Sequence, residues 1–297
     1  MPLPLAIRYQ TRAMSEPIRT VIAGLGTALG PDVMARCRAL FDAEQQALAR
    51  QAAPLACDLA YGPDPRQRLD LYGPAPAGSG LRPVAVFVHG GGFVQGDKAA
   101  DGWPNAAFGR WAALQGFLGA VINYRLAPDA PWPAGAEDLL AAADWLAAHG
   151  AAHGGDPARI VLVGTSAGAV HIAGAVALRP DLAVRGAALL SGLYGYTALD
   201  PRDERYYGAP ALYPARMPRA ALAATALPLF LACAQYDPPR FQAEFLGLMA
   251  ERLERHGALP RGMIAADHNH YSMALHIGTS DTRLAGELAT FIKDQTA

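Results

Sequence analysis

Arg159-Ile160-Val161-Leu162-Val163 runs directly into Gly164-Thr165-Ser166-Ala167-Gly168, and this junction decides the fold. The first stretch is mostly apolar and typical of a buried strand, whereas the apolar run 169–178 that follows is typical of a helix. A serine in a G-x-S-x-G sequence at a strand-to-helix turn has the pattern of a nucleophile elbow, which exposes the serine hydroxyl. The glycines are needed because a Cβ beside so sharp a turn would collide with the backbone. The junction therefore predicts an α/β fold with Ser166 as a candidate nucleophile.

The composition is that of a folded chain without an evident charged partner. Of its 297 residues, 52% are hydrophobic and 17% are charged, which supplies enough apolar side chains for a large core. The formal net charge of −1 gives no electrostatic reason to expect nucleic acid or a membrane as a partner. The three cysteines have neither disulfide nor metal-ligand spacing. Since the chain shows no signal-peptide pattern and no apolar run of about 18 residues, we expect a cytoplasmic protein that needs no metal or other cofactor.

Strand-like and helix-like segments alternate along most of the chain. Apolar strands that alternate with helices indicate a mostly parallel sheet with helices on both faces. We divide the chain into an N-terminal helical cap segment, 1–52, and a main domain, 53–297, with an insertion at about 194–226. The insertion is rich in tyrosine and proline, and we expect it to form a lid with the N-terminal helices. The expected strands are 55–60, 68–72, 84–88, 117–123, 159–164, 184–191, 227–234 and 261–266, and the expected helices are 32–51, 135–149, 169–178, 240–256 and 281–295.

A nucleophilic serine needs a base and an acid that orients the base. In this fold class the chain order is nucleophile, acid, histidine. Asp237 follows the apolar run 228–236, so we expect it at the carboxyl-end rim of the sheet, where ligands bind in open α/β sheets. A helix cap before 238–239 is the alternative role for this aspartate. His268 and His270 both follow the last expected strand, and the chain order alone does not separate them.

A glycine run follows the expected strand 84–88. His89-Gly90-Gly91-Gly92-Phe93 matches the HGGG-type motif whose backbone N–H groups stabilise negative charge on a reacting oxygen. A phosphate loop is the alternative reading. The glycine run lacks the Gly-Lys-Ser/Thr of a Walker motif, and the chain has no G-x-G-x-x-G at a strand-to-helix turn. We therefore interpret the run as an oxyanion hole.

Taken together, these motifs resemble those of the α/β-hydrolase superfamily, and within it the hormone-sensitive-lipase-like carboxylesterases and acyl hydrolases. Tyr124-Arg125-Leu126-Ala127-Pro128 is also similar to a structural stretch of that family. The resemblance implies an α/β-hydrolase fold, with an eight-stranded type of sheet and a small cap. It assigns the oxyanion donors to the N–H groups of Gly91, Gly92 and Ala167. The sequence 269–272, Asn-His-Tyr-Ser, is similar to the N-H-F-S form of arylformamidases and other carboxylesterases, and this similarity favours His270 over His268.

The resemblance implies a serine hydrolase that cleaves short-chain carboxylic esters through an acyl-enzyme, with Ser166, Asp237 and His270 as its triad. The expected partner is a small-molecule ester, and a homodimer is a candidate assembly because relatives are often dimers. An arylformamidase-like amidase and a non-catalytic ligand-binding homologue are the alternatives. Position 165 departs from the family, which usually has an acidic residue there. The residues that we expect to contact the substrate are Phe93, Thr165, Tyr194 and Tyr196.

Overall fold

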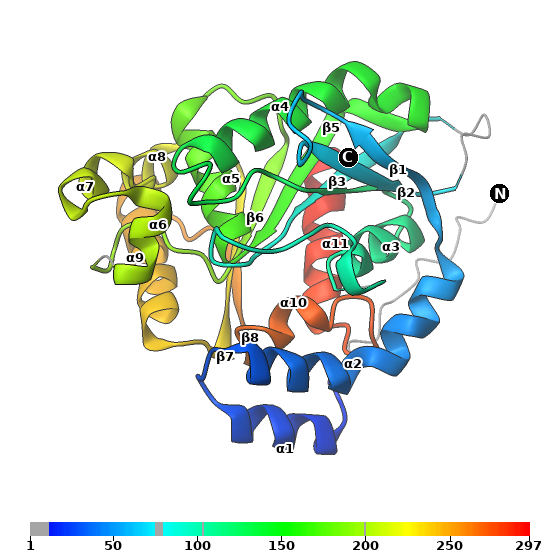
Figure 1. The fold of residues 1–297 in the computed structure, drawn as a ribbon, viewed down its shortest axis with the longest axis horizontal. Helices are drawn as coiled ribbons and strands as arrows, with labels where there is room; N and C mark the ends of the chain where they lie inside the picture. The colour runs from blue at the N-terminus through cyan, green and yellow to red at the C-terminus, as the bar shows by residue number, and fades with distance from the viewer. Residues whose placement is uncertain (1–11, 75–79, 103, 199) are drawn as a thin grey trace.

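A single eight-stranded sheet runs through the molecule, with helices on both faces (Figure 1). The computed structural model describes residues 12–74, 80–102, 104–198 and 200–297. The strand order is β1-β2-β4-β3-β5-β6-β7-β8. The strands are β1 (Pro54–Ala60), β2 (Arg68–Tyr72), β3 (Arg82–Val88), β4 (Leu118–Ile122), β5 (Gly155–Thr165), β6 (Gly186–Leu190), β7 (Leu229–Tyr236) and β8 (Arg261–Asn269).

Only one end of the sheet is antiparallel. Strand β2 pairs antiparallel with β1 and β4, whereas every neighbouring pair from β4 to β8 is parallel. The predicted mostly parallel α/β-hydrolase sheet is therefore confirmed. Because parallel strands end at the same edge, the segments that follow β3, β5, β6, β7 and β8 meet at one rim, which is where this fold class places its ligands.

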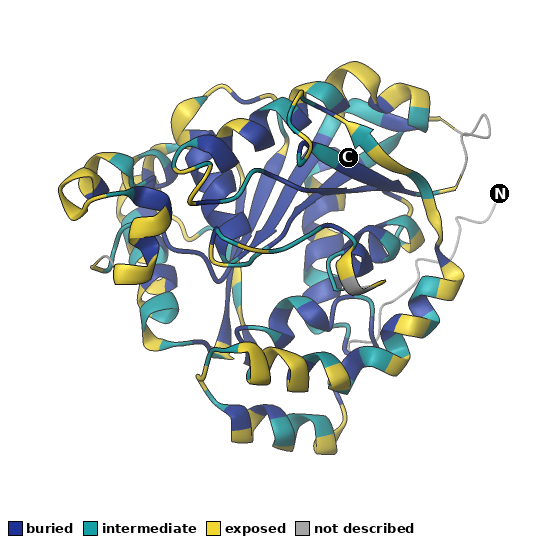
Figure 2. Cartoon of the chain, viewed as in Figure 1, coloured by how far each residue is buried: buried dark blue, intermediate teal, exposed yellow. Residues whose placement is uncertain are grey.

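Helices cover both faces of this sheet. Figure 2 shows the central strands buried between helices whose outer sides are exposed, whereas the edge strand β1 is largely exposed. One apolar core includes Phe108, Phe230 and Phe291, and the core on the other face includes Leu139 and Ile172. The α-helices are α1 (Glu16–Leu25), α2 (Pro31–Gln51), α3 (Ala106–Leu114), α4 (Ala134–His149), α5 (Ala167–Leu178), α6 (Glu204–Tyr207), α7 (Tyr213–Arg216), α8 (Arg219–Ala224), α9 (Pro239–His256), α10 (Ser272–Leu275) and α11 (Arg283–Thr296).

The structure differs from most of the expected elements by one or two residues at an end, and by more at two strand ends. Strand β5 begins at Gly155 because this residue pairs with Arg82 before the regular register starts. Strand β8 runs on to Asn269 because a register shift lets that residue pair with Tyr236. His268 and Asn269 therefore end a strand, where the sequence pattern predicted a loop. Helix α3 was not expected, and residues 1–11 of the predicted helical segment lie outside the described residues.

The N-terminal helices and the insertion lie at different places around the rim (Figure 1). Helices α1 and α2 supply Ile22 and Phe41 to the core that also holds α3 and α11. The insertion contains α6, α7 and α8, and its residues Tyr206 and Tyr207 are buried beside Ala167. In the part of the chain that the structure describes, we find no helix with the length and apolar character of a membrane span.

Candidate active site

The turn at Ser166 has the strained geometry of a nucleophile elbow. Its φ of 52° and ψ of −121° lie where residues with a Cβ are rarely found. A Cβ on Gly164 would lie 2.6 Å from the carbonyl carbon of Gly168, and a Cβ on Gly168 would lie 2.0 Å from the carbonyl oxygen of Val88. Both glycines of the motif are thus required by close backbone approach. The backbone N–H of Ser166 donates to the carbonyl of Leu190 over 2.8 Å and fixes the turn to β6.

The structure brings Ser166, His270 and Asp237 together from three separate parts of the chain. His270 Nε2 lies 3.0 Å from Ser166 Oγ, and His270 Nδ1 lies 2.7 Å from Asp237 Oδ1. Asp237 is fully buried, while Ser166 stays partly exposed. The ring of Phe241 packs against the imidazole with its centroid 4.3 Å away. This is the hydrogen-bonded order of groups that activates a serine hydroxyl.

The far oxygen of the Asp237 carboxylate has two donors of its own. Its Oδ2 accepts from the backbone N–H of Ala234 over 2.7 Å and from the hydroxyl of Ser191 over 2.5 Å. Ser191 follows β6 and has a φ of 49°. Sequence reasoning missed Ser191, although its position after a core strand, at the same rim as Asp237, was an available signal.

The glycine-rich loop after β3 lies against the elbow. A Cβ on Gly90 would be 3.2 Å from the Cβ of Ser166, and one on Gly91 would be 1.9 Å from the carbonyl oxygen of Gln95. Gly91 and Gly92 have φ values of 134° and 58°, which favour glycine. Among the described residues, no group accepts a hydrogen bond from the backbone N–H of Gly91 or Gly92. The N–H of Ala167 lies in the first turn of α5 and has no partner within the helix.

A column of buried rings supports this loop from behind. The Tyr124 hydroxyl donates to the carbonyl of His89 over 2.8 Å, and the two rings stack with centroids 4.4 Å apart. His171 follows in the column, with its Nδ1 3.2 Å from the hydroxyl of Tyr206. Burial lowers the pKa of His89 to about 4 and that of His171 to about 3. Both imidazoles are therefore neutral near pH 7 and serve as packing groups.

Two of the residues expected to contact the substrate lie beside the elbow. Phe93 is buried in a cluster with Ala167 and stacks on Tyr206 at 4.4 Å. Thr165 is buried with its Cγ2 facing Gly90. The structure packs the other two against α8 and α9. Tyr194 lies in the core beneath α8, and the Tyr196 hydroxyl donates to Glu251 of α9 over 2.9 Å.

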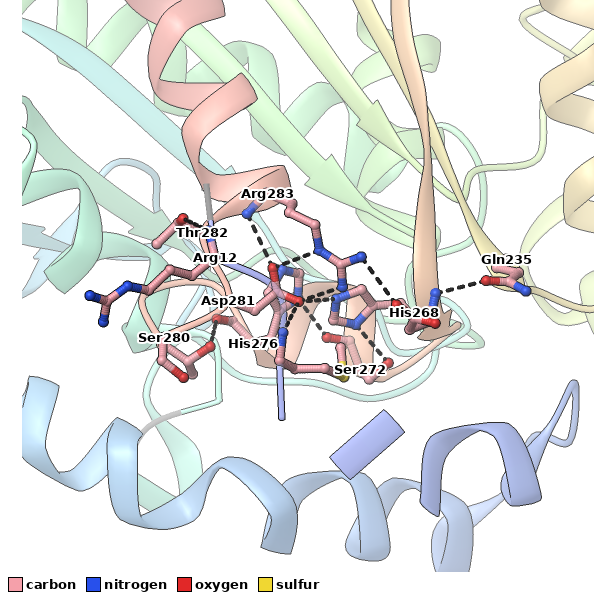
Figure 3. A network of polar contacts seen from close by, with 12 residues as sticks. Arg12, Gln235, His268, Ser272, His276, Ser280, Asp281, Thr282 and Arg283 are labelled. Carbon is pink, nitrogen blue, oxygen red and sulfur yellow. Dashed lines mark hydrogen bonds and ion pairs between the residues drawn. The ribbon is translucent and has the colours of Figure 1, made fainter. Parts of the chain in front are cut away.

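His268, the alternative base, faces a different set of partners (Figure 3). Its Nδ1 lies 3.0 Å from Ser272 Oγ and its Nε2 lies 3.3 Å from Asp281 Oδ2. Its ring stacks on His276 with centroids 3.9 Å apart. His268, His276 and Asp281 converge as metal ligands do, but the guanidinium of Arg283 already pairs with Asp281 over 2.7 Å. That carboxylate therefore has a cationic partner within the chain.

Proteins of known sequence support a relationship with esterases. A family model described as BD-FAE matches residues 69–184. The probable isoprenylcysteine alpha-carbonyl methylesterase ICMEL1 of Oryza sativa subsp. japonica is 43% identical over 126 residues, which are 42% of this chain and 28% of that protein. Esterase LipQ of Mycobacterium tuberculosis is 31% identical over 216 residues, which are 64% of this chain and 50% of that protein. The chain thus spans half or less of the length of these two relatives.

Solved structures match the fold over nearly the whole chain. An esterase from the archaeon Pyrobaculum calidifontis superposes with a TM-score of 0.68 at 23% identity, over 95% of this chain and 99% of that one. A bacterial heroin esterase gives a TM-score of 0.68 at 23% identity, over 95% and 98% of the two chains. By its sheet order and elbow this chain has the α/β-hydrolase fold, and over part of its length its sequence resembles hormone-sensitive-lipase-like esterases.

Proposed function

We propose that this protein is a serine carboxylic-ester hydrolase. The observation that carries the proposal is the hydrogen-bonded chain from Asp237 through His270 to Ser166, with distances of 2.7 and 3.0 Å. It ends on a serine held in a strained turn, which is where a nucleophile is expected. The esterase names of the sequence relatives support the same reaction class.

In the proposed mechanism, His270 takes the proton of Ser166 while Oγ attacks the ester carbonyl carbon. The N–H groups of Gly91, Gly92 and Ala167 bind the resulting oxyanion. The intermediate collapses as the bond to the alkoxy oxygen breaks, and His270 gives its proton to the departing alcohol. A water molecule then loses a proton to His270 and attacks the acyl carbon. The bond from that carbon to Ser166 Oγ breaks, His270 returns the proton to Oγ, and the carboxylic acid leaves. Asp237 holds the imidazole in the required tautomer throughout.

The proposed substrates are small esters with short acyl chains. Phe93, Tyr206 and Tyr207 are buried in one cluster with Ala167, so large rings occupy the space beside the oxyanion donor. These rings come partly from the insertion 194–226, which we propose as part of the cap. A bulky or long acyl group would have to displace them, whereas an acetyl or butanoyl group would not.

The test uses 4-nitrophenyl esters from acetate to decanoate. We expect the wild type to hydrolyse the short esters fastest and Ser166→Ala to lose hydrolysis, while the exposed-serine control Ser280→Ala keeps it. A fluorophosphonate probe should label the wild type at Ser166 and leave Ser166→Ala unlabelled. Hydrolysis that survives in Ser166→Ala would contradict the proposal, and so would a preference for anilide analogues over esters.

A further inference from the structure

A buried polar cluster includes residues on both sides of His270 in the chain, and Figure 3 shows its side chains gathered around Asp281. Its members come from the end of β8, from α10 and the segment that follows it, and from the first residue of α11, and none of them belongs to the proposed triad. We call it the His268 cluster. All of its members except Arg283 are buried. The cluster consists of His268, Ser272, His276, Asp281 and Arg283.

Two hydrogen bonds between Asn269 and Ser272 close the turn around His270. The Ser272 hydroxyl oxygen accepts from the backbone N–H of Asn269 over 2.9 Å, and Asn269 Oδ1 accepts from the backbone N–H of Ser272 over 2.9 Å. The two bonds are reciprocal and span the residues on both sides of His270. The turn therefore has one conformation as long as the Ser272 hydroxyl keeps its orientation.

His268 sets that orientation. The Asp281 carboxylate can only accept, so His268 Nε2 carries the proton and donates to Oδ2 over 3.3 Å. In this neutral ring Nδ1 is an acceptor, and the Ser272 hydroxyl donates to it over 3.0 Å, a shorter contact than the 3.4 Å from the same hydroxyl to the carbonyl of Asn269. Burial lowers the pKa of His268, which keeps the ring in the neutral form that this arrangement requires.

The Asp281 carboxylate connects the cluster to other parts of the chain. Asp281 Oδ2 accepts from Arg283 over 2.7 Å and from the backbone N–H of Met14 over 3.2 Å. On the far side of the ring, His276 stacks on His268 and donates through Nδ1 to the carbonyl of Ser272 over 2.9 Å. His268 is thus held on one face by a ring and at its far nitrogen by an anchored carboxylate.

We propose that His268 is a positioning residue: acting through Ser272, it holds the turn that presents His270 to Ser166 and Asp237. The inference rests on the proposed hydrolase function, since it concerns the base of that reaction. The geometry gives it a physical reason. His270 must keep distances of 3.0 and 2.7 Å to two partners at once, and a misplacement of about 1 Å costs on the order of a hundredfold in rate.

The experiment compares His268→Leu with His268→Gln. Leucine fills the site without polar atoms, whereas glutamine retains an acceptor for Ser272 and a donor for Asp281. We expect His268→Leu to lower kcat and the rate of fluorophosphonate labelling of Ser166 on the order of tenfold to a hundredfold, with KM unchanged. We expect His268→Gln to keep most of the wild-type kcat and labelling rate. The downfield proton resonance of the His270–Asp237 hydrogen bond should be lost in Leu and present in Gln.

Two further variants separate positioning from general destabilisation. Ser272→Ala removes both the hydroxyl bond to His268 and the bond that the hydroxyl oxygen accepts from the Asn269 N–H, and we expect it to reproduce the loss of labelling. Thr296→Val removes a buried hydroxyl bond at the end of α11 and should change thermal stability without changing labelling or the proton resonance. Wild-type labelling in His268→Leu or Ser272→Ala would overturn the inference, as would equal losses in the Leu and Gln variants. A wild type that the probe does not label would instead overturn the proposed hydrolase function.

Discussion

The hydroxyl of Ser191 donates a 2.5 Å hydrogen bond to Asp237 Oδ2, on the opposite side of the carboxylate from His270. The carboxylate is therefore held from both ends, by the imidazole at Oδ1 and by Ser191 together with the Ala234 N–H at Oδ2. Two donors at Oδ2 fix the rotation of the carboxylate, which in turn fixes the imidazole. Ser191 thus extends the triad by one hydrogen bond in the structure.

Removing the Ser191 hydroxyl should weaken catalysis without abolishing it. A hydrogen bond to a charged group contributes about 1.5–3 kcal/mol, so we expect Ser191→Ala to lower kcat/KM by roughly tenfold or more. Ser191→Gly is the matched variant, because glycine also lacks the hydroxyl but relaxes the φ of 49°. Steady-state kinetics on a short 4-nitrophenyl ester should show similar losses in both variants. Wild-type kinetics in both variants would show that the Ser191 hydroxyl does not position the carboxylate.

The strained turn at Ser166, which activity requires, should lower the free energy of unfolding. Both Ser166→Ala and Ser166→Gly should be inactive, but only glycine accommodates a φ of 52° without strain. Because such strain costs about 1–3 kcal/mol, we expect the glycine variant to have the larger free energy of unfolding, by about 1 kcal/mol after its extra chain entropy. Urea denaturation measures the difference. Equal free energies of unfolding in the two variants would show that the turn stores no strain.

Within the glycine-rich loop, a methyl group at Gly91 should be far more damaging than one at Gly92. At Gly91 a Cβ would lie 1.9 Å from backbone, whereas at Gly92 it would meet open space. Losing an oxyanion donor costs about 10²–10³ in kcat, and we expect Gly91→Ala to fall in that range. Gly92→Ala should mainly lose about 1 kcal/mol of stability because of its φ of 58°. Measurements of kcat and Tm in both variants test this prediction. Equal kcat values in Gly91→Ala and Gly92→Ala would contradict it.

Buried neutral histidines should make the fold less stable in mild acid. Burial lowers the pKa of His171 and of His276 to about 3, while an unfolded histidine titrates near 6.5. Between these values the unfolded chain binds more protons, so the contribution is complete above about pH 6.5 and is lost as the pH falls toward 3. As the pH decreases through that window, each such histidine should lower the free energy of unfolding by about 1.4 kcal/mol per pH unit.

The measurement is the free energy of unfolding between pH 5 and 7, above the range where carboxylates titrate. His171→Phe, which keeps a ring in the column, should show a shallower slope than the wild type. The exposed His149 provides the control, and His149→Gln should keep the wild-type slope. Identical slopes in all three proteins would refute the assignment of His171 as a buried neutral group.

Glu244 should be essential for holding the start of the insertion, residues 194–197, in place. It is fully buried, and its carboxylate accepts hydrogen bonds from the backbone N–H groups of residues 194–197 and from the Thr197 hydroxyl. In Glu244→Gln an NH₂ group would face one of those donors, so we expect a loss of about 3 kcal/mol and faster proteolysis within 194–226. The exposed Glu254→Gln is the control. Unchanged proteolysis in Glu244→Gln would show that these bonds do not hold the insertion.

Local sequence patterns predicted the sheet well because its strands are short and apolar. Strand β2 has the expected bounds, and α2 and α4 each begin one residue from the expected start. The largest errors occur where pairing with a distant strand extends an element, as Arg82 does for β5 and Tyr236 for β8, whereas β4 and β6 are slightly shorter than expected. Helix α3 escaped prediction because it is short and follows a loop that has no clear start signal.

The candidate site was predictable only to the level of residue identity. The motif residues Ser166, Gly91 and Asp237 can be recognised in the sequence because they follow core strands. Ser191 also follows a core strand, but neither it nor Glu244 lies in a recognisable motif, and their partners are 46 residues or more away along the chain. The roles of Tyr194 and Tyr196 as substrate contacts stay predictions, and the structure packs both against the helices of the insertion and α9.

The sequence by itself determined the alternation of strands and helices, the strained serine turn and the order of nucleophile, acid and histidine, because these depend on local periodicity and on where glycine is required. The resemblance favoured His270, and the tertiary structure places that residue against Asp237. Only the tertiary structure decided which side chain holds the other carboxylate oxygen and what His268 binds. Those choices depend on distances between segments that the chain brings together only when the parallel strands end at one rim, and no local pattern encodes such distances.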